Sequence, residues 1–286
     1  MSPELYWPFQ EKTVTTNANV ALDRSMTIAD PQLARIPGGE FLMGAADGQP
    51  DERPVHRVRV SEFFIGRFPV TNDEYARFVR ATGHPAPDVR GLPLFATGDR
   101  EALFREFAAP YIWQNGEPPS GRGNHPVMLV THDDAVAYCG WLSVALQRPV
   151  RLPTEAEWEK AARGGAEATK FPWGNEIDPS CCNYLSDPST KEQRGTRPTG
   201  TYPPNPFGLC DVIGNAWEWM TDWYSSDYYG ESEAADPHGP SSGSLRVVRG
   251  GSWVTHDVAM LRTSYRHAVP PDSYAYSIGF RIVCSE

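Results

Sequence analysis

The chain has 286 residues, 40% of them hydrophobic and 22% charged, which is the composition of a globular protein with enough apolar side chains for a core. Its formal net charge of -10 argues against a nucleic-acid partner, because a phosphate-binding surface is basic. No stretch approaches the roughly 20 apolar residues that cross a bilayer, and the first residues lack the pattern of a secretory signal. We therefore expect a cytoplasmic protein that binds neither nucleic acid nor membrane.

The first third of the sequence predicts an arm followed by short strands and a helix. Residues 1–33 are polar with little periodicity, and residues 34–286 are taken as one domain. Strands are predicted over residues 35–44, with a Gly-Gly turn between two of them, and over residues 55–60 and 63–65. Thr71 and Glu74 have the spacing of a capping box, which predicts that a helix begins there.

The rest of the sequence predicts fewer regular elements. A region rich in Gly, Pro and Asp follows at residues 82–124, with one short helix predicted around residues 100–107. Two further helices are predicted to begin at Thr131 and Thr154, each with an acidic residue three positions later. After Gly164 and Gly165 only short strands are predicted, near residues 245–249 and 279–283. These elements indicate an α+β fold with a few helices, small antiparallel sheets and much irregular structure.

The cysteines do not indicate a disulfide scaffold or a zinc site. There are five, an odd number, at positions 139, 181, 182, 210 and 284. Their spacing offers no convincing set of four zinc ligands. We expect mostly reduced thiols, and the sequence leaves the oligomeric state unknown.

Seven segments of the sequence, in their order and spacing, are similar to one protein family. They are IPGGEFLMG at 36–44, PVTN at 69–72, RLPTEAEWEKAARGG at 151–165, FPWGN at 171–175, GLCDVIGNAWEW at 208–219, RGGSW at 249–253, and PDS at 271–273 with IGFR at 278–281. Together they resemble the formylglycine-generating-enzyme or sulfatase-modifying-factor superfamily over residues 34–284. The resemblance implies a single domain with an elaborated C-type-lectin-like fold and little regular secondary structure.

The resemblance also implies structural calcium. In the family one calcium ion is held by the segment that matches residues 211–218. The ligands here would be the Asp211 side chain, the Gly214 and Ala216 carbonyls and the Glu218 carboxylate, a set of oxygens that suits calcium. The alternative is that Asp211 and Glu218 only cap turns.

A second calcium site of the family would begin at Asn183 and Tyr184. Its downstream half departs from the family pattern, because Lys191 or the nearby Glu192 stands where the family has an acidic ligand. A lysine has no lone pair to donate and repels a cation. The sequence therefore favours the first calcium site over the second.

The residues that carry the family's reaction are missing. The resemblance implies that its enzymes bind copper and engage a substrate cysteine through two cysteines that follow the Gly-Gly-Ser motif. The matching positions here are Thr255 and Met260, neither of which forms the thiolate that such a copper site needs. The sequence therefore predicts a protein without formylglycine-generating activity.

New side chains occupy the region of the family's cleft, which Ser252 and Trp217 match. His256, Asp257 and His267 have the composition of a two-histidine, one-carboxylate metal site, although such histidines often only form hydrogen bonds at the surface. With Ser252 they are the candidate catalytic residues, and whether a redox metal is bound stays open. Arg262 and Arg266 could clamp a carboxylate or phosphate, or pair with acidic residues. The candidate ligand-binding residues are Trp217, Trp253, Thr255, Arg262, Tyr265, Arg266 and Tyr274.

Three functions fit this pattern. The first is a repurposed oxidoreductase acting on a small molecule in a tailoring or maturation pathway, because the superfamily includes members that oxidise small molecules in siderophore maturation. The second is a non-catalytic domain that binds a protein or peptide, like the family's cysteine-lacking paralogues. The third is a ligand-binding variable protein of a diversity-generating retroelement. We favour the first, because ionisable loops around an inherited cleft are what a new active site needs.

Overall fold

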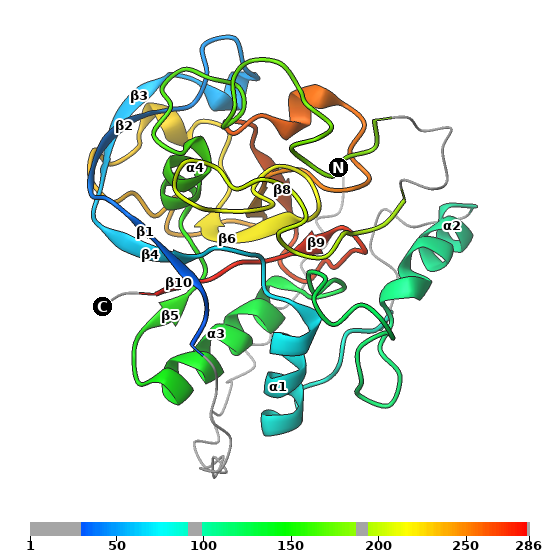
Figure 1. The fold of residues 1–286 in the computed structure, drawn as a ribbon. Helices are drawn as coiled ribbons and strands as arrows, with labels where there is room; N and C mark the ends of the chain where they lie inside the picture. Colours follow the sequence, from blue (N-terminus) through cyan, green and yellow to red (C-terminus); the bar gives the residue numbers. More distant parts are fainter. Residues whose placement is uncertain (1–29, 91–98, 187–193, 285–286) are drawn as a thin grey trace, which may run out of the picture.

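The computed structural model describes residues 30–90, 99–186 and 194–284 (Figure 1). Its α-helices are α1 Asn72–Thr82, α2 Asp99–Ala108, α3 His132–Leu146 and α4 Glu155–Arg163. Its strands are β1 Leu33–Ile36, β2 Gly39–Met43, β3 His56–Val60, β4 Phe63–Gly66, β5 Val150–Arg151, β6 Trp217–Trp223, β7 Arg246–Arg249, β8 His267–Val269, β9 Ile278–Gly279 and β10 Val283–Cys284. Single 3-10 turns cover Pro50–Glu52, Ala109–Tyr111, Tyr228–Gly230 and Val258–Leu261. The α+β fold with little regular structure is therefore confirmed. Most of the predicted arm at residues 1–33 lies outside the described residues.

Capping boxes start three of these helices, as predicted. At α1 the Thr71 side chain accepts a hydrogen bond from the Glu74 amide, and the Glu74 carboxylate accepts one from the Thr71 amide. The same reciprocal arrangement begins α3 at Thr131 and α4 at Thr154. These contacts satisfy amides that a helix start leaves without intrahelical partners.

The strands form two four-stranded sheets and one pair. The strand orders are β1-β4-β10-β5, β2-β3 and β8-β7-β6-β9. The Gly-Gly turn predicted between β1 and β2 is not a hairpin, because β1 pairs with β4 while β2 pairs with β3. The chain thus changes sheets at Gly38 and Gly39.

Helix α4 lies in the interior, among the strands (Figure 1). All nine of its residues are buried, including Glu155, Glu157, Glu159, Lys160 and Arg163. It contacts β2 and β3 as well as β6 and β7. Because a buried charge is stable only when it is paired, this helix requires charged partners from the elements around it.

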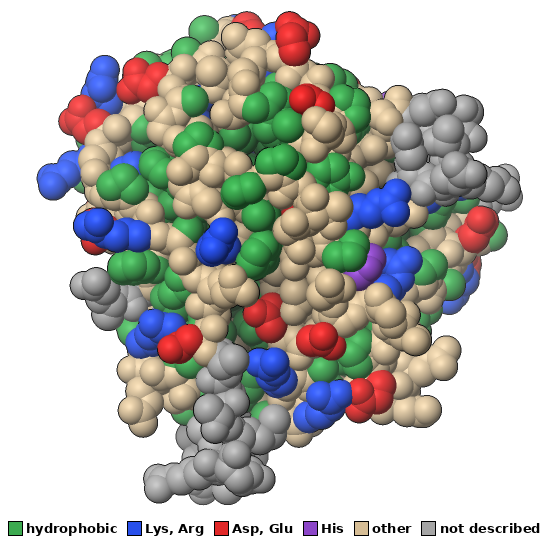
Figure 2. Space-filling model, in the orientation of Figure 1, with side chains coloured by type: hydrophobic (Ala, Val, Ile, Leu, Met, Phe, Trp, Pro, Cys, Tyr) green, Lys and Arg blue, Asp and Glu red, His purple; other side chains and the backbone are tan. Residues whose placement is uncertain are grey.

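The surface carries charges of both signs, and the thiols are free. On the face shown in Figure 2, basic side chains are interspersed with acidic and uncharged ones. Among the helices described, none has the length and apolar character needed to cross a membrane. All five cysteines are unpaired, which confirms the prediction of reduced thiols.

Candidate functional site

Two glycines shape the start of the segment in which most candidate site residues lie. Gly250 and Gly251 follow β7 with φ angles of 97° and 75°. A Cβ at Gly250 would lie 2.9 Å from the Val212 carbonyl oxygen, and one at Gly251 would lie 2.4 Å from a Leu261 methyl group. Only glycine adopts this backbone and leaves this space, so the Gly-Gly pair fixes the path of residues 252–266.

Ser252 does not face a cleft. Its side chain is fully buried, and its amide donates a hydrogen bond of 3.0 Å to the Thr255 hydroxyl. The Thr255 amide in turn donates to the Ser252 carbonyl, so the two residues close a local turn. The Ser252 hydroxyl is therefore enclosed by the fold, and Thr255, itself buried, is held by the same turn.

The predicted metal triad is not assembled. His256 is exposed, and the Asp257 carboxylate accepts a hydrogen bond from the Ala259 amide at the start of a 3-10 turn. His267 lies on β8, where its ring packs against Trp217 at 5.2 Å, and burial lowers its pKa. In the described ranges no three His, Cys, Asp or Glu side chains gather closely enough to hold a metal ion. His256 and Asp257 lie together at the start of the Val258–Leu261 turn, whereas His267 lies on β8, so the structure favours the alternative of separate local roles.

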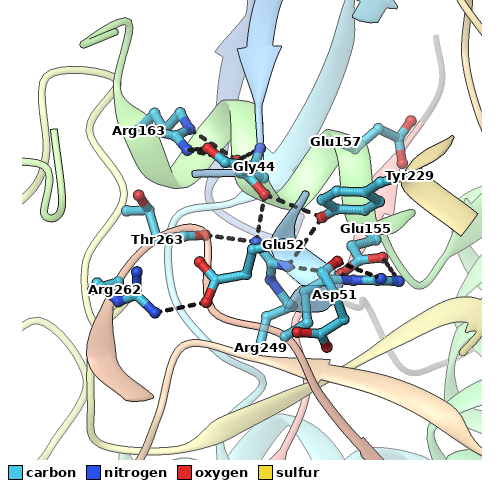
Figure 3. Close-up of polar contacts among 12 residues, drawn as sticks. Gly44, Asp51, Glu52, Glu155, Glu157, Arg163, Tyr229, Arg249, Arg262 and Thr263 are labelled. Carbon is cyan, nitrogen blue, oxygen red and sulfur yellow. Dashed lines mark hydrogen bonds and ion pairs between the residues drawn. The ribbon is translucent and has the colours of Figure 1, made fainter. Parts of the chain in front are cut away.

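Arg262 and Arg266 form no common clamp, because each has its own buried acidic partner. Arg262 donates to Glu52 at 2.6 Å (Figure 3). Arg266 binds both carboxylate oxygens of Glu155 at 2.8 and 2.9 Å. The remaining Arg266 terminal nitrogen donates to the backbone carbonyls of Asp51 and Ser225. Every nitrogen of Arg266 is thus engaged.

Arg249 links these pairs into a buried network. Its guanidinium binds Glu155 at 2.7 Å (Figure 3). It also binds Glu159 at 2.6 Å, and Glu159 binds Arg163 at 2.7 Å. Arg249 and Glu159 are fully buried. The network joins α4 to β7 and to the loop before β8, so it fixes the walls of the neighbouring cavities.

One of these cavities contains three of the predicted site residues. It has a volume of about 600 Å³, and its lining includes Tyr265, Arg266 and His267 together with Asp51, Tyr224 and Asp227. We call it the β8 cavity. The Tyr224 hydroxyl donates to the Asp51 carboxylate at 2.8 Å, and burial followed by this contact raises the pKa of Tyr224 to about 12. The cavity therefore combines aromatic walls with carboxylates.

Two adjoining cavities lie beside Arg262. They have volumes of about 600 and 380 Å³, and both are lined by Asp47, Lys170, Asn175 and Arg262. Val258 and Ala259, which lie between the positions of the two missing cysteines, line the smaller one. Because Arg262 is paired with Glu52, its charge is already balanced from inside the protein.

The aromatic candidates divide between two places. Trp217 contacts Tyr265 and His267 and therefore supports the β8 cavity from behind. Trp253 and Tyr274 instead belong to a buried aromatic cluster under α2, in which the Trp253 indole donates to the Tyr276 carbonyl at 2.9 Å. The structure brings Tyr265, Arg266 and His267 together and separates Trp253 and Tyr274 from them.

The proposed calcium ligands differ in how well they fit a cation. One Asp211 carboxylate oxygen accepts from the Gly200 amide, while the other is buried without a hydrogen-bond partner, and burial raises the pKa of Asp211 to about 6. Asp211 therefore fits a cation ligand. Glu218 does not, because both of its oxygens are bound by Arg281 at 2.6 and 2.7 Å and one also accepts from Trp158. A guanidinium in this position repels a second cation.

Two of the other predicted calcium ligands, Gly214 and Asn183, form hydrogen bonds within the fold. The Gly214 carbonyl accepts a hydrogen bond from the Ala216 amide at 2.8 Å. The Asn183 side chain donates to the Gly195 carbonyl and to Asn215, which ties two loops together, and Tyr184 is buried in the core beside it. Lys191 and Glu192 lie outside the described residues.

Several residues of the site were missed from the sequence. Asp51, Tyr224 and Asp227 line the β8 cavity, and Glu52 and Glu155 supply the buried carboxylates. Glu155 belongs to a recognised motif, but the others carry no local pattern. Their role appears only when the fold brings distant loops together.

Comparisons with known proteins agree with this architecture. Residues 20–286 match the sulfatase-modifying factor enzyme 1-like domain. The chain is 40% identical to the formylglycine-generating enzyme of Streptomyces coelicolor over 86% of this chain and 87% of that protein. It is 33% identical to the inactive C-alpha-formylglycine-generating enzyme 2 of Mus musculus over 90% of this chain and 86% of that protein. The structure of PvdO from Pseudomonas aeruginosa is similar with a TM-score of 0.73 at 28% identity, covering 90% of this chain and 95% of that one. The chain therefore belongs to the sulfatase-modifying-factor enzyme 1-like family, the family of the formylglycine-generating enzymes.

Proposed function

We propose that this protein has no formylglycine-generating activity and works as an oxidoreductase on a small molecule bound in the β8 cavity. The observation that carries the first part is the pair Thr255 and Met260 at the cysteine positions, because neither side chain replaces a copper-binding thiolate. The second part is supported by the size of the cavity, which lies within the range of about 300–1,000 Å³ typical of small-molecule sites.

The side chains of the β8 cavity would bind and orient the substrate. Tyr265 and His267 offer flat surfaces for packing, and Trp217 behind them limits their movement. Arg266 would act as a positioning residue, because its contacts with Asp51 and Ser225 join the two loops that line the cavity. We assign no redox-metal ligands, since the predicted triad is not assembled.

A binding function without catalysis is the second candidate. It is favoured by the similarity to the inactive mouse paralogue and by the burial of Ser252, the one nucleophilic hydroxyl among the predicted catalytic residues. The ligand would then be a small molecule or a peptide. The variable-protein hypothesis stays a prediction, which a template repeat and a reverse-transcriptase gene beside the coding sequence would support.

We also infer structural calcium at Asp211. The Asp211 oxygen that is buried without a hydrogen-bond partner supports this assignment. Glu218 would not be a ligand of the ion, because Arg281 binds its carboxylate. Calcium would neutralise a carboxylate that is otherwise costly to bury.

The experiment that separates these proposals measures metal content and oxygen uptake of the purified protein. The oxidoreductase proposal expects oxygen uptake that depends on an added small molecule, falls in Tyr265→Ala, and is unchanged in Tyr202→Phe, which lies outside the cavity. Ligand binding without oxygen uptake would favour the binding domain. Formation of formylglycine on a sulfatase-derived cysteine peptide would overturn the first part of the proposal.

A further inference from the structure

The acidic side chains that line the β8 cavity are open to a ligand, whereas its one basic side chain is already paired within the protein. Its lining contains two carboxylates, Asp51 and Asp227, and one guanidinium, Arg266. The Arg266 side chain is 0% exposed and all its nitrogens are bonded, so its charge is balanced by Glu155 inside the protein. The cavity therefore presents negative charge to a ligand.

The two carboxylates are available to a ligand. Asp51 Oδ2 accepts a hydrogen bond from Tyr224, and among the described residues no other hydrogen bond or ion pair reaches its carboxylate. Asp227 precedes the 3-10 turn Tyr228–Gly230 and is exposed, and within the part of the chain that the structure describes no hydrogen bond or ion pair reaches its carboxylate. A carboxylate that lines a cavity without a protein cation is a ready partner for a ligand cation.

The remaining walls are aromatic. Tyr224, Tyr265 and His267 line the same cavity, and burial lowers the pKa of His267, which favours its neutral ring at neutral pH. Aromatic faces attract cations. In the protein itself, the Arg266 guanidinium lies over the Tyr224 ring, 5.0 Å from its centroid. A neutral aromatic wall beside carboxylates is the chemistry of ammonium recognition.

We infer that the β8 cavity binds a small organic cation, such as a primary amine or a guanidine. This inference rests on the proposed function, because it names the class of molecule bound at the same site. A metal ion fits the cavity less well, since among the described residues no three His, Cys, Asp or Glu side chains gather there to hold one. An anion is disfavoured because no unpaired cation lines this cavity among the described residues.

The test compares three probes that share a benzyl group and differ in charge: benzylamine, benzyl alcohol and phenylacetate. Isothermal titration of the full chain should show benzylamine binding at least about tenfold more tightly than benzyl alcohol, and phenylacetate binding more weakly than either. Asp51→Asn and Asp227→Asn should each weaken benzylamine binding about three- to fivefold, and the double variant should erase its preference. Asp51→Asn keeps an acceptor for the Tyr224 hydroxyl, so the fold is preserved.

Glu231→Gln is the matched control, because this exposed carboxylate lies close in sequence to Asp227 but does not line the cavity. Benzylamine binding should be unchanged in it. Tighter binding of phenylacetate, displacement of benzylamine by calcium, absence of benzylamine binding, or equal binding in the double variant would each overturn the inference. Binding of phenylacetate or benzyl alcohol that supports oxygen uptake would overturn the charge class while leaving the proposed function intact.

Discussion

Arg249 shows how a single buried residue holds the site in place. It has no exposed surface and binds Glu155, Glu159 and the Thr263 carbonyl. Without Arg249, the buried carboxylates of Glu155 and Glu159 each lose one cationic partner. A buried charge that loses its partner destabilises the fold by more than the ion pair had stabilised it. We expect Arg249→Met to lower the free energy of unfolding by about 3–5 kcal/mol in urea denaturation.

The matched control for this prediction is Arg57→Met. Arg57 lies 3.6 Å from Glu40, with both side chains more than half exposed. An exposed pair contributes less than about 1 kcal/mol, because water screens it. Equal losses in the two variants would contradict the importance assigned to burial.

Asp222 gives a prediction for the dependence of stability on pH. It is almost fully buried, and burial, followed by the nearby Glu155 carboxylate, raises its pKa to about 7. The folded state therefore holds this proton more tightly than the unfolded chain, so its contribution to stability falls as pH rises from about 4 to about 7. Asp222→Asn removes this loss and keeps an acceptor for the Glu155 amide.

The stability of Asp222→Asn relative to the unmodified protein should increase with pH. Between about pH 5 and pH 7 the gain should reach about 2 kcal/mol, because one pKa unit corresponds to about 1.4 kcal/mol. Urea denaturation at several pH values measures it. A difference between the two proteins that stays constant over this range would rule out Asp222 as the titrating group.

For single residues, the sequence shows directly which catalytic side chains are missing, but it does not show which side chains contact one another. Thr255 and Met260 are read directly from their places after the Gly-Gly-Ser motif. The partners of Arg262 and Arg266 lie 210 and 111 residues away, at Glu52 and Glu155. The sequence left open whether these arginines clamp a ligand or pair with acidic residues, and the structure shows two buried ion pairs whose partners no periodicity could name.

Helices with a local start signal were predicted correctly. The Thr-x-x-Glu pattern at α1 lies within four residues, and its two hydrogen bonds need no other part of the chain. Thr71→Ala should cost about 1 kcal/mol of stability, while Thr71→Ser, which keeps the hydroxyl, should cost less than half of that. Urea denaturation compares the two variants, and a Thr71→Ser loss equal to that of Thr71→Ala would show that the methyl group, rather than the cap, matters.

Strands β6 and β8 were missed because their partners are distant. β6 pairs with β7 and with β9, and β8 pairs with β7. β6 is buried along most of its length, so it lacks the alternation of polar and apolar residues that marks a half-exposed strand. β8 is three residues long, which is too short for a pattern. The β8 cavity is lined by His267 of β8 and by Tyr224, which directly follows β6, so its position was not available from periodicity.

The whole molecule has the architecture of its family, while most of its candidate site lies outside the segments that carry the resemblance. The segments that carry the resemblance build α4, β6 and the buried pair of Glu218 with Arg281. The lining of the β8 cavity comes instead from loops around Asp51, Tyr224 and Asp227. The sequence therefore predicts the scaffold through motifs, whereas the site depends on how loops outside those motifs meet.

Calcium binding is the property that tests the whole fold, because Asp211 lies where loops from several parts of the chain meet. A ligand that binds only the folded state stabilises it, by about 2.7 kcal/mol at a hundredfold excess over its Kd. We expect added calcium to raise the melting temperature and a chelator to lower it. Since the pKa of Asp211 is raised to about 6, its carboxylate is largely protonated at about pH 5, and the rise in melting temperature should be larger at about pH 8.

Asp211→Asn should reduce this rise in melting temperature, whereas Asp178→Asn, at an exposed carboxylate, should leave it unchanged. A calcium effect that persists in Asp211→Asn and does not vary with pH would place the ion elsewhere, and no effect at all would show that the buried Asp211 oxygen is tolerated as a neutral acid.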